Sequence, residues 1–282
     1  MVGVLGVSAS AILVRFSQAP SGVTAAYRLG WTVLLLLPVV LLRCRAELRR
    51  VTARDLVLCG ASGVLLALHF LTWFESLKRT SVAPSTVLVS TEVIFTALGF
   101  ALFLHGKIPR LGVWAILLAF GGSALLALSG GGGAGELSGN LLALAAASAA
   151  AVYTLIGRIQ RGHLSTTVYT FLTYLACFLT LLLGTAAAGT PLTGYGGREW
   201  LIGLALAVLC TLLGHSLFSW CLKYLSPSYV SAAKLCEPVF SSLAAIPLFG
   251  EVPGPLQLAG GAAVLGAVLL YTWAEREKTP AG

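Results

Sequence analysis

Ten apolar runs, each close to the length of a membrane-spanning helix, fill almost the whole chain. A helix needs about 20 mainly apolar residues to cross the hydrocarbon core of a bilayer. Only 10% of the 282 residues are charged, whereas soluble domains carry about 25%. The pattern predicts an all-α integral membrane protein with ten transmembrane helices, at about 1–17, 22–42, 55–77, 82–104, 111–129, 138–157, 166–188, 200–222, 228–249 and 256–274.

Basic residues gather in the loops on one side of the predicted membrane. Twelve Lys and Arg fall on this side, five of them between Arg43 and Arg54, against three on the other side. Cytoplasmic loops carry such an excess in membrane proteins. We therefore expect a multi-pass protein of the cytoplasmic membrane with both termini in the cytoplasm. This distribution also argues against nucleic acid as a partner, despite the net charge of +8. Thr52-Ala53-Arg54-Asp55 fits a capping box at the start of the third run.

The two halves of the chain are related by a weak internal repeat. The segment from Leu77 aligns without gaps to the segment from Leu222, an offset of 145 residues that pairs Glu92 with Glu237. Five predicted spans separate equivalent points, and this odd number places the halves in opposite orientations. Inverted repeats are typical of secondary transporters, whose binding sites lie near the bilayer midplane between the repeats.

A glycine-rich stretch, Gly130 to Gly135, marks the predicted join between the halves. Such a stretch forms a flexible linker, and it lacks the G-x-x-x-x-G-K-[ST] order of a nucleotide-binding loop. The sequence also predicts no cofactor and no metal site, because its cysteines fall singly and its histidines have no further ligand at metal-binding spacing. The predicted units are a first repeat at 1–129, a linker at 130–137, a second repeat at 138–274 and a cytoplasmic tail at 275–282.

Several short motifs resemble those of EamA-type permeases, a family of the drug/metabolite transporter superfamily. The first half contains His69-Phe70-x-x-Trp73-x-x-Ser76-Leu77, and the second contains Gly214-His215, Glu237-Pro238-Val239 and Phe249-Gly250-Glu251. The resemblance covers nearly the whole chain. It implies ten helices in two inverted five-helix repeats, a central cavity that opens to alternate sides, and small metabolites as substrates.

Polar and aromatic side chains inside the apolar runs are the candidates for substrate binding. A charged residue at the bilayer centre costs about 2.5–3.5 kcal/mol on insertion scales, so such residues face a cavity or pair with one another. The candidates for the cavity are Arg28, His69, Trp73, Glu92, Tyr153, His215, Trp220, Lys234 and Glu237.

The two mid-span glutamates differ in their sequence neighbours. Lys234 precedes Glu237 by three residues, a spacing that allows an ion pair on one helix face. Glu92 has no basic residue three or four positions away. We therefore expect Glu237 to stay charged and to hold substrate or Lys234, and Glu92 to be the group that exchanges a proton. The alternative is that both are structural, Glu237 in a self-neutralised pair and Glu92 in a hydrogen bond between helices.

Each half also offers one imidazole and one indole at similar depth. His69 and Trp73 share a helix face, and His215 and Trp220 occupy the corresponding run of the second half. They are expected to line one central space, or else to serve helix packing. Arg28 is placed to pair with Glu75 or to contact substrate. Tyr153 is expected to line the cavity or to act as an interfacial anchor.

These features predict a secondary active transporter, not an enzyme, that exports a small metabolite such as an amino acid, nucleoside, nucleobase or amine by alternating access. Its expected partners are the substrate, the lipid bilayer and a coupling proton, and it acts as a monomer or homodimer. The alternatives are a membrane channel, or an intramembrane lipid-modifying enzyme. The enzyme is disfavoured because the ionisable residues are scattered and mid-span.

Overall fold

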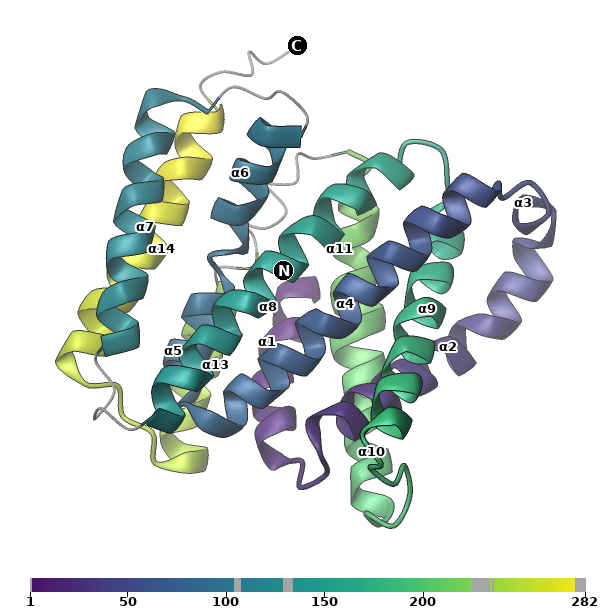
Figure 1. Cartoon of the computed structure of the whole chain (residues 1–282), viewed down its shortest axis with the longest axis horizontal. Coiled ribbons are helices and arrows are strands. Elements are labelled where there is room, and N and C mark those ends of the chain that lie inside the picture. The colour runs from purple at the N-terminus through teal and green to yellow at the C-terminus, as the bar shows by residue number, and fades with distance from the viewer. Residues whose placement is uncertain (1, 104–107, 129–133, 225–233, 235, 277–282) are drawn as a thin grey trace.

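The computed structural model describes the chain except for residues 1, 104–107, 129–133, 225–233, 235 and 277–282. The described residues form helices joined by short connections, and none of them forms a strand (Figure 1). The helices are α1 (Val2–Phe16), α2 (Ser21–Arg43), α3 (Arg45–Leu48), α4 (Ala53–Arg79), α5 (Val82–Val89), α6 (Glu92–Phe103), α7 (Arg110–Leu128), α8 (Ala134–Gln160), α9 (Thr166–Ala187), α10 (Gly197–Ala205), the π-helix η1 (Leu206–His215), α11 (Ser216–Cys221), α13 (Cys236–Phe249) and α14 (Pro255–Arg276).

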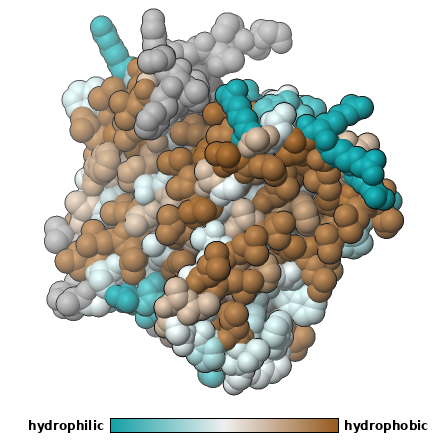
Figure 2. Space-filling view, turned by 45° about the vertical axis from the view of Figure 1, so that its right-hand side comes forward, coloured by the Kyte–Doolittle hydropathy of each residue, from teal (hydrophilic) through white to brown (hydrophobic). Residues whose placement is uncertain are grey.

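Within the described part of the chain, seven helical segments are long and apolar enough to cross a membrane, and three shorter apolar helices accompany them. The shorter ones cover Gly6–Phe16, Arg110–Leu126 and Glu237–Phe249. The expectation of an all-helical, multi-pass membrane protein is therefore confirmed. The surface agrees with a lipid environment, because large apolar side chains such as Leu42 and Leu183 are more than 70% exposed. Figure 2 shows apolar side chains over most of one face, with hydrophilic residues gathered at its rim.

Helix α4 crosses the front of the bundle in Figure 1, where it packs against α8 and α9 and leaves residues such as Val57 exposed on its outer face. Its start has the expected capping box, in which the Thr52 hydroxyl accepts from the Asp55 amide and the Asp55 carboxylate accepts from the Thr52 amide. Gly63 permits the close approach to α9. A Cβ atom there would lie 2.5 Å from the Cβ of Ala176 and 2.6 Å from the Thr173 carbonyl oxygen.

The fourth predicted span, 82–104, is not one continuous helix, contrary to expectation. It is divided between α5 and α6 at Ser90 and Thr91. The Ser90 hydroxyl donates to the Thr86 carbonyl, and the Thr91 hydroxyl donates to the Leu88 carbonyl. Hydroxyls that bond to the preceding turn compete with the helical ladder, and they favour the interruption at this point.

The repeat-related glutamates both stand at the start of a helix. Glu92 is the first residue of α6, and Glu237 is the second residue of α13. The predicted ninth span began at 228, but residues 228–233 and 235 lie outside the described part of the chain. Carboxylates in the first turn of a helix interact favourably with the helix dipole, so both glutamates occupy a position suited to a negative charge.

The basic segments lie at one end of the molecule. Helix α3, which follows the Arg-rich end of α2, and the C-terminal end of α14 both lie at this end, and the start of α10 lies at the opposite end (Figure 1). We call these the basic end and the α10 end. This arrangement matches the separation of charge that the sequence predicts.

Candidate functional site

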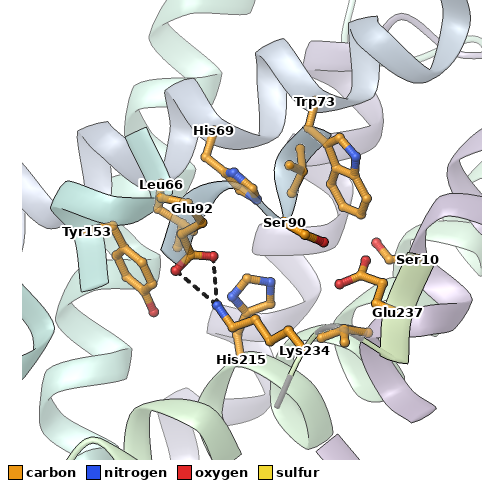
Figure 3. A pocket seen from close by; sticks show the side chains of 13 residues that line it. Ser10, Leu66, His69, Trp73, Ser90, Glu92, Tyr153, His215, Lys234 and Glu237 are labelled. Atoms are coloured by element: carbon orange, nitrogen blue, oxygen red, sulfur yellow. Dashed lines mark hydrogen bonds and ion pairs between the residues drawn. The ribbon is translucent and has the colours of Figure 1, made fainter. Parts of the chain in front are cut away.

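A buried pocket lies between the first and second halves of the chain (Figure 3). Helices α1, α4, α5 and α6 contribute to its wall from the first half, and α8, η1 and α13 contribute from the second. Its volume is about 30 Å³, room for about two water molecules. The lining residues are Val7, Ser10, Leu66, His69, Trp73, Val89, Ser90, Glu92, Ala150, Tyr153, His215, Lys234 and Glu237. Seven of the nine candidate residues are therefore brought together here.

One ion pair crosses the pocket between the halves. The Lys234 ammonium lies 3.0 Å from Oε2 and 3.2 Å from Oε1 of Glu92, and Thr154 of α8 donates to Oε1 over 2.8 Å. The expected pair of Lys234 with Glu237 is wrong, and Glu92, which has no basic neighbour in sequence, is paired with Lys234. The reason is local, since α13 begins at Cys236 and Lys234 precedes it, so the three-residue helical spacing does not apply.

The Glu237 carboxylate faces the pocket without a counter-ion in contact. Among the described residues, no cation lies within salt-bridge distance of it and no hydrogen bond reaches its oxygens. Figure 3 shows it pointing into the pocket toward Ser90 and Trp73. An isolated ionised carboxylate is costly to bury. The Glu237 side chain is half-buried, so a cation or a proton from outside the described side chains would stabilise it.

Aromatic rings from both halves of the chain line the pocket. The rings of His69 and Trp73 stack with centroids 5.8 Å apart, as their spacing on one helix face predicts, and His215 lies 6.4 Å from His69. The Nδ1 atom of His69 is 3.0 Å from the Ala146 carbonyl oxygen. Because a carbonyl only accepts, Nδ1 carries the hydrogen, and Nε2 of the neutral ring is left as an acceptor.

Arg28 lies beside the pocket without lining it. It is fully buried, it donates to Thr211 over 2.7 Å and to Ser10 over 3.1 Å, and its guanidinium lies 4.2 Å from the ring centre of Phe70. The expected pairing with Glu75 is wrong, because Glu75 forms its salt bridge with Arg79. Arg28 thus supports the pocket wall at Ser10.

The two remaining aromatic candidates differ in position. Tyr153 lines the pocket, and its hydroxyl lies 3.3 Å from that of Ser219. Trp220, in contrast, lies outside the pocket, is 48% exposed and packs on Tyr224. Sequence reasoning also missed Ser10 and Ser90 as lining residues. The position of Ser90, two residues before a mid-span glutamate, is the signal that could have identified it.

Polar contacts tie the helices together at the α10 end. Arg15 of α1 pairs with Glu251, and it donates to the Leu77 carbonyl over 2.7 Å. The other carboxylate oxygen of Glu251 accepts from the Val82 amide over 2.7 Å. These contacts join α1, the end of α4, the start of α5 and the connection between α13 and α14 at this end.

The lining residues are suited to holding a solute. Within the described part of the chain, no group of three His, Cys, Asp or Glu residues could bind a metal ion. The pocket instead combines an internal ion pair, an unpaired carboxylate and aromatic faces, buried inside a bundle of apolar helices. This fold and site define the class of the protein as a multi-pass membrane transporter.

Comparison with known proteins identifies the family. The sequence model of the EamA-like transporter family matches residues 1–128 and 137–273. The chain therefore belongs to the EamA-like transporter family. A crystal structure of a protein with 20% sequence identity superposes with a TM-score of 0.66 over 99% of this chain and 96% of that one, which shows that the two share a fold.

Two relatives are named as exporters. The chain is 24% identical to the pseudopaline exporter CntI of Pseudomonas aeruginosa, over 73% of this chain and 72% of that protein. It is 28% identical to a probable terminal-alkyne amino-acid exporter of Streptantibioticus cattleyicolor, over 79% of this chain and 75% of that one. It is also 29% identical to an uncharacterized transporter, YwfM, of Bacillus subtilis, over 78% of this chain and 74% of that protein.

Proposed function

We propose that the protein is a secondary active exporter that moves a small metabolite by alternating access between two inverted five-helix repeats, residues 1–129 and 138–274. The observation that carries the proposal is the pocket itself, because side chains from both halves line it and its only described ion pair joins the two halves. Relative movement of the repeats must break or reshape this wall. The two separate family matches support the division into repeats.

The substrate classes that we propose are amino acids, nucleosides, nucleobases and amines. The name of the Streptantibioticus relative favours the first of these. The present pocket has room for only about two water molecules. A metabolite would therefore bind in a more open state, which is what alternating access requires.

We place the basic end in the cytoplasm, with both termini, and the protein in the cytoplasmic membrane. The charge distribution supports this orientation. The contacts of Arg15 and Glu251 then close the external side of the pocket. Solute would enter from the cytoplasm and leave after these contacts break. The pocket is built within one chain, so a monomer suffices for transport, and a homodimer would carry two such pockets.

We assign proton exchange to Glu237, not to Glu92. Glu92 is occupied by Lys234 and Thr154, whereas Glu237 has no described partner. A proton would neutralise Glu237 in the empty pocket. The other titratable groups that line the pocket are His69, Tyr153 and His215.

The test is solute counterflow in proteoliposomes that contain the purified protein. A carrier gives saturable exchange of labelled for unlabelled solute, and a channel gives flux that does not saturate. An intramembrane enzyme gives neither and chemically alters its substrate. Glu237→Gln is expected to abolish the stimulation of transport by a pH gradient, and Glu75→Gln, a carboxylate outside the pocket, is the matched control. Non-saturating flux would refute the carrier.

A further inference from the structure

We propose that the pocket recognises a primary ammonium group on the transported solute, with Glu237 as its counter-ion. This inference rests on the proposed function and narrows its substrate class to solutes that carry such a group. Its support is the Glu237 carboxylate, together with the acceptors near it that stay open in the pocket wall once the internal contacts are made.

The only ammonium group among the described residues of the pocket wall, that of Lys234, is already committed to the protein. Lys234 donates to both oxygens of Glu92, and its Nζ atom lies 5.5 Å from the ring centre of Phe218. The nearby guanidinium of Arg28 donates to the hydroxyls of Thr211 and Ser10. Lys234 is therefore committed to Glu92. The Nη2 atom of Arg28 and the Nε1 atom of Trp73 have no hydrogen-bond partner, but both atoms are buried and present no donor at the pocket surface. Among the described residues, the charged group open to a ligand is the Glu237 carboxylate, which favours a cation.

Three of the acceptors that stay open among the described residues of the wall are suited to an ammonium group. The first is the Glu237 carboxylate. The second is Nε2 of His69, because Nδ1 donates its hydrogen to the Ala146 carbonyl. The third is the Ser90 oxygen, whose hydrogen is donated to Thr86. A primary ammonium has three N–H donors, and hydrogen bonds between charged partners are the stronger ones.

The size and the walls of the pocket fit the same group. An ammonium head is close in size to a water molecule, and the pocket has room for about two. The Trp73 ring stands above Glu237 and Ser90 in Figure 3, where an indole face attracts a cation. A quaternary ammonium has the charge without the N–H donors.

Three matched probes test the inference on the purified full-length protein. They are 2-phenylethylamine, its N,N,N-trimethyl derivative, and 3-phenylpropionate. Affinity is measured from the rise in apparent melting temperature with probe concentration. We expect the primary amine to bind at least about tenfold more tightly than either of the others, the size of effect that one charge-assisted hydrogen bond produces.

Two variants locate the binding to the carboxylate. Glu237→Gln is expected to weaken binding of the amine by about tenfold or more, and Glu75→Gln is expected to leave it unchanged. Equal or tighter binding of the carboxylate or the trimethyl probe to the native protein overturns the inference, and this comparison does not depend on how well a variant folds. Unchanged amine affinity in a folded Glu237→Gln variant also overturns it. Saturable counterflow of 3-phenylpropionate would refute the ammonium site and leave the carrier function standing.

Discussion

The pairing of Lys234 with Glu92, and not with Glu237, has a measurable energetic consequence. The charged atoms are 3.0 Å apart, and the two side chains are 18% and 6% exposed. At an effective dielectric constant of about 20, two unit charges at this distance attract by about 5–6 kcal/mol. Desolvation offsets much of this attraction, but removal of one partner from a buried pair costs about 3–5 kcal/mol because a charge is left unpaired.

Two double-mutant cycles separate the possible partners. The first combines Lys234→Met with Glu92→Gln, and the second combines Lys234→Met with Glu237→Gln. The free energy of unfolding is measured by denaturant titration in detergent micelles. We expect a coupling of about 2–3 kcal/mol in the first cycle and less than about 1 kcal/mol in the second. A larger coupling of Lys234 to Glu237 than to Glu92 would refute the pair of Lys234 with Glu92. It would instead support an ion pair between Lys234 and Glu237, as their three-residue spacing predicts.

Three further predictions address packing, the site and the topology. Gly63→Ala is expected to destabilise the protein by about 1–3 kcal/mol in the same titration, because the added Cβ would lie 2.5 Å from that of Ala176; an unchanged free energy would show that α4 and α9 are less closely packed. Trp73→Ala is expected to weaken solute binding in the melting assay, whereas Trp220→Ala, outside the pocket, leaves it unchanged; the reverse order would relocate the site. A cysteine introduced at residue 132 of the linker is expected to react with an impermeant thiol reagent added outside intact cells, and reaction only after permeabilisation would reverse the proposed orientation.

The helices and much of the pocket could be predicted from the sequence because they depend on strong local signals. Apolar runs of spanning length define the helices, and the cost of burying charge directs polar residues toward a shared interior. The capping box at Thr52 and the shared helix face of His69 and Trp73 needed only short-range spacing, and both are confirmed.

The errors arose where the helical ladder is interrupted. The predicted pair of Lys234 and Glu237 assumed a continuous helix through both residues, but α13 begins at Cys236. Lys234 instead reaches Glu92, 142 residues away in sequence. Contacts of this kind depend on how the halves pack, which residue spacing does not encode. Packing also decides the position of Trp220. It belongs to the same predicted span as His215, but only His215 lines the pocket.

The most direct test of the account is the accessibility of the pocket from the two sides of the membrane. Ser90→Cys, in an otherwise cysteine-free protein, places a small thiol in the pocket wall. Impermeant thiol reagents are then applied from each side of oriented membrane vesicles. Alternating access predicts reaction from either side, protection by transported solute, and faster external reaction when Glu251→Gln weakens the contacts with Arg15 and Val82. Reaction from only one side under every condition would contradict it.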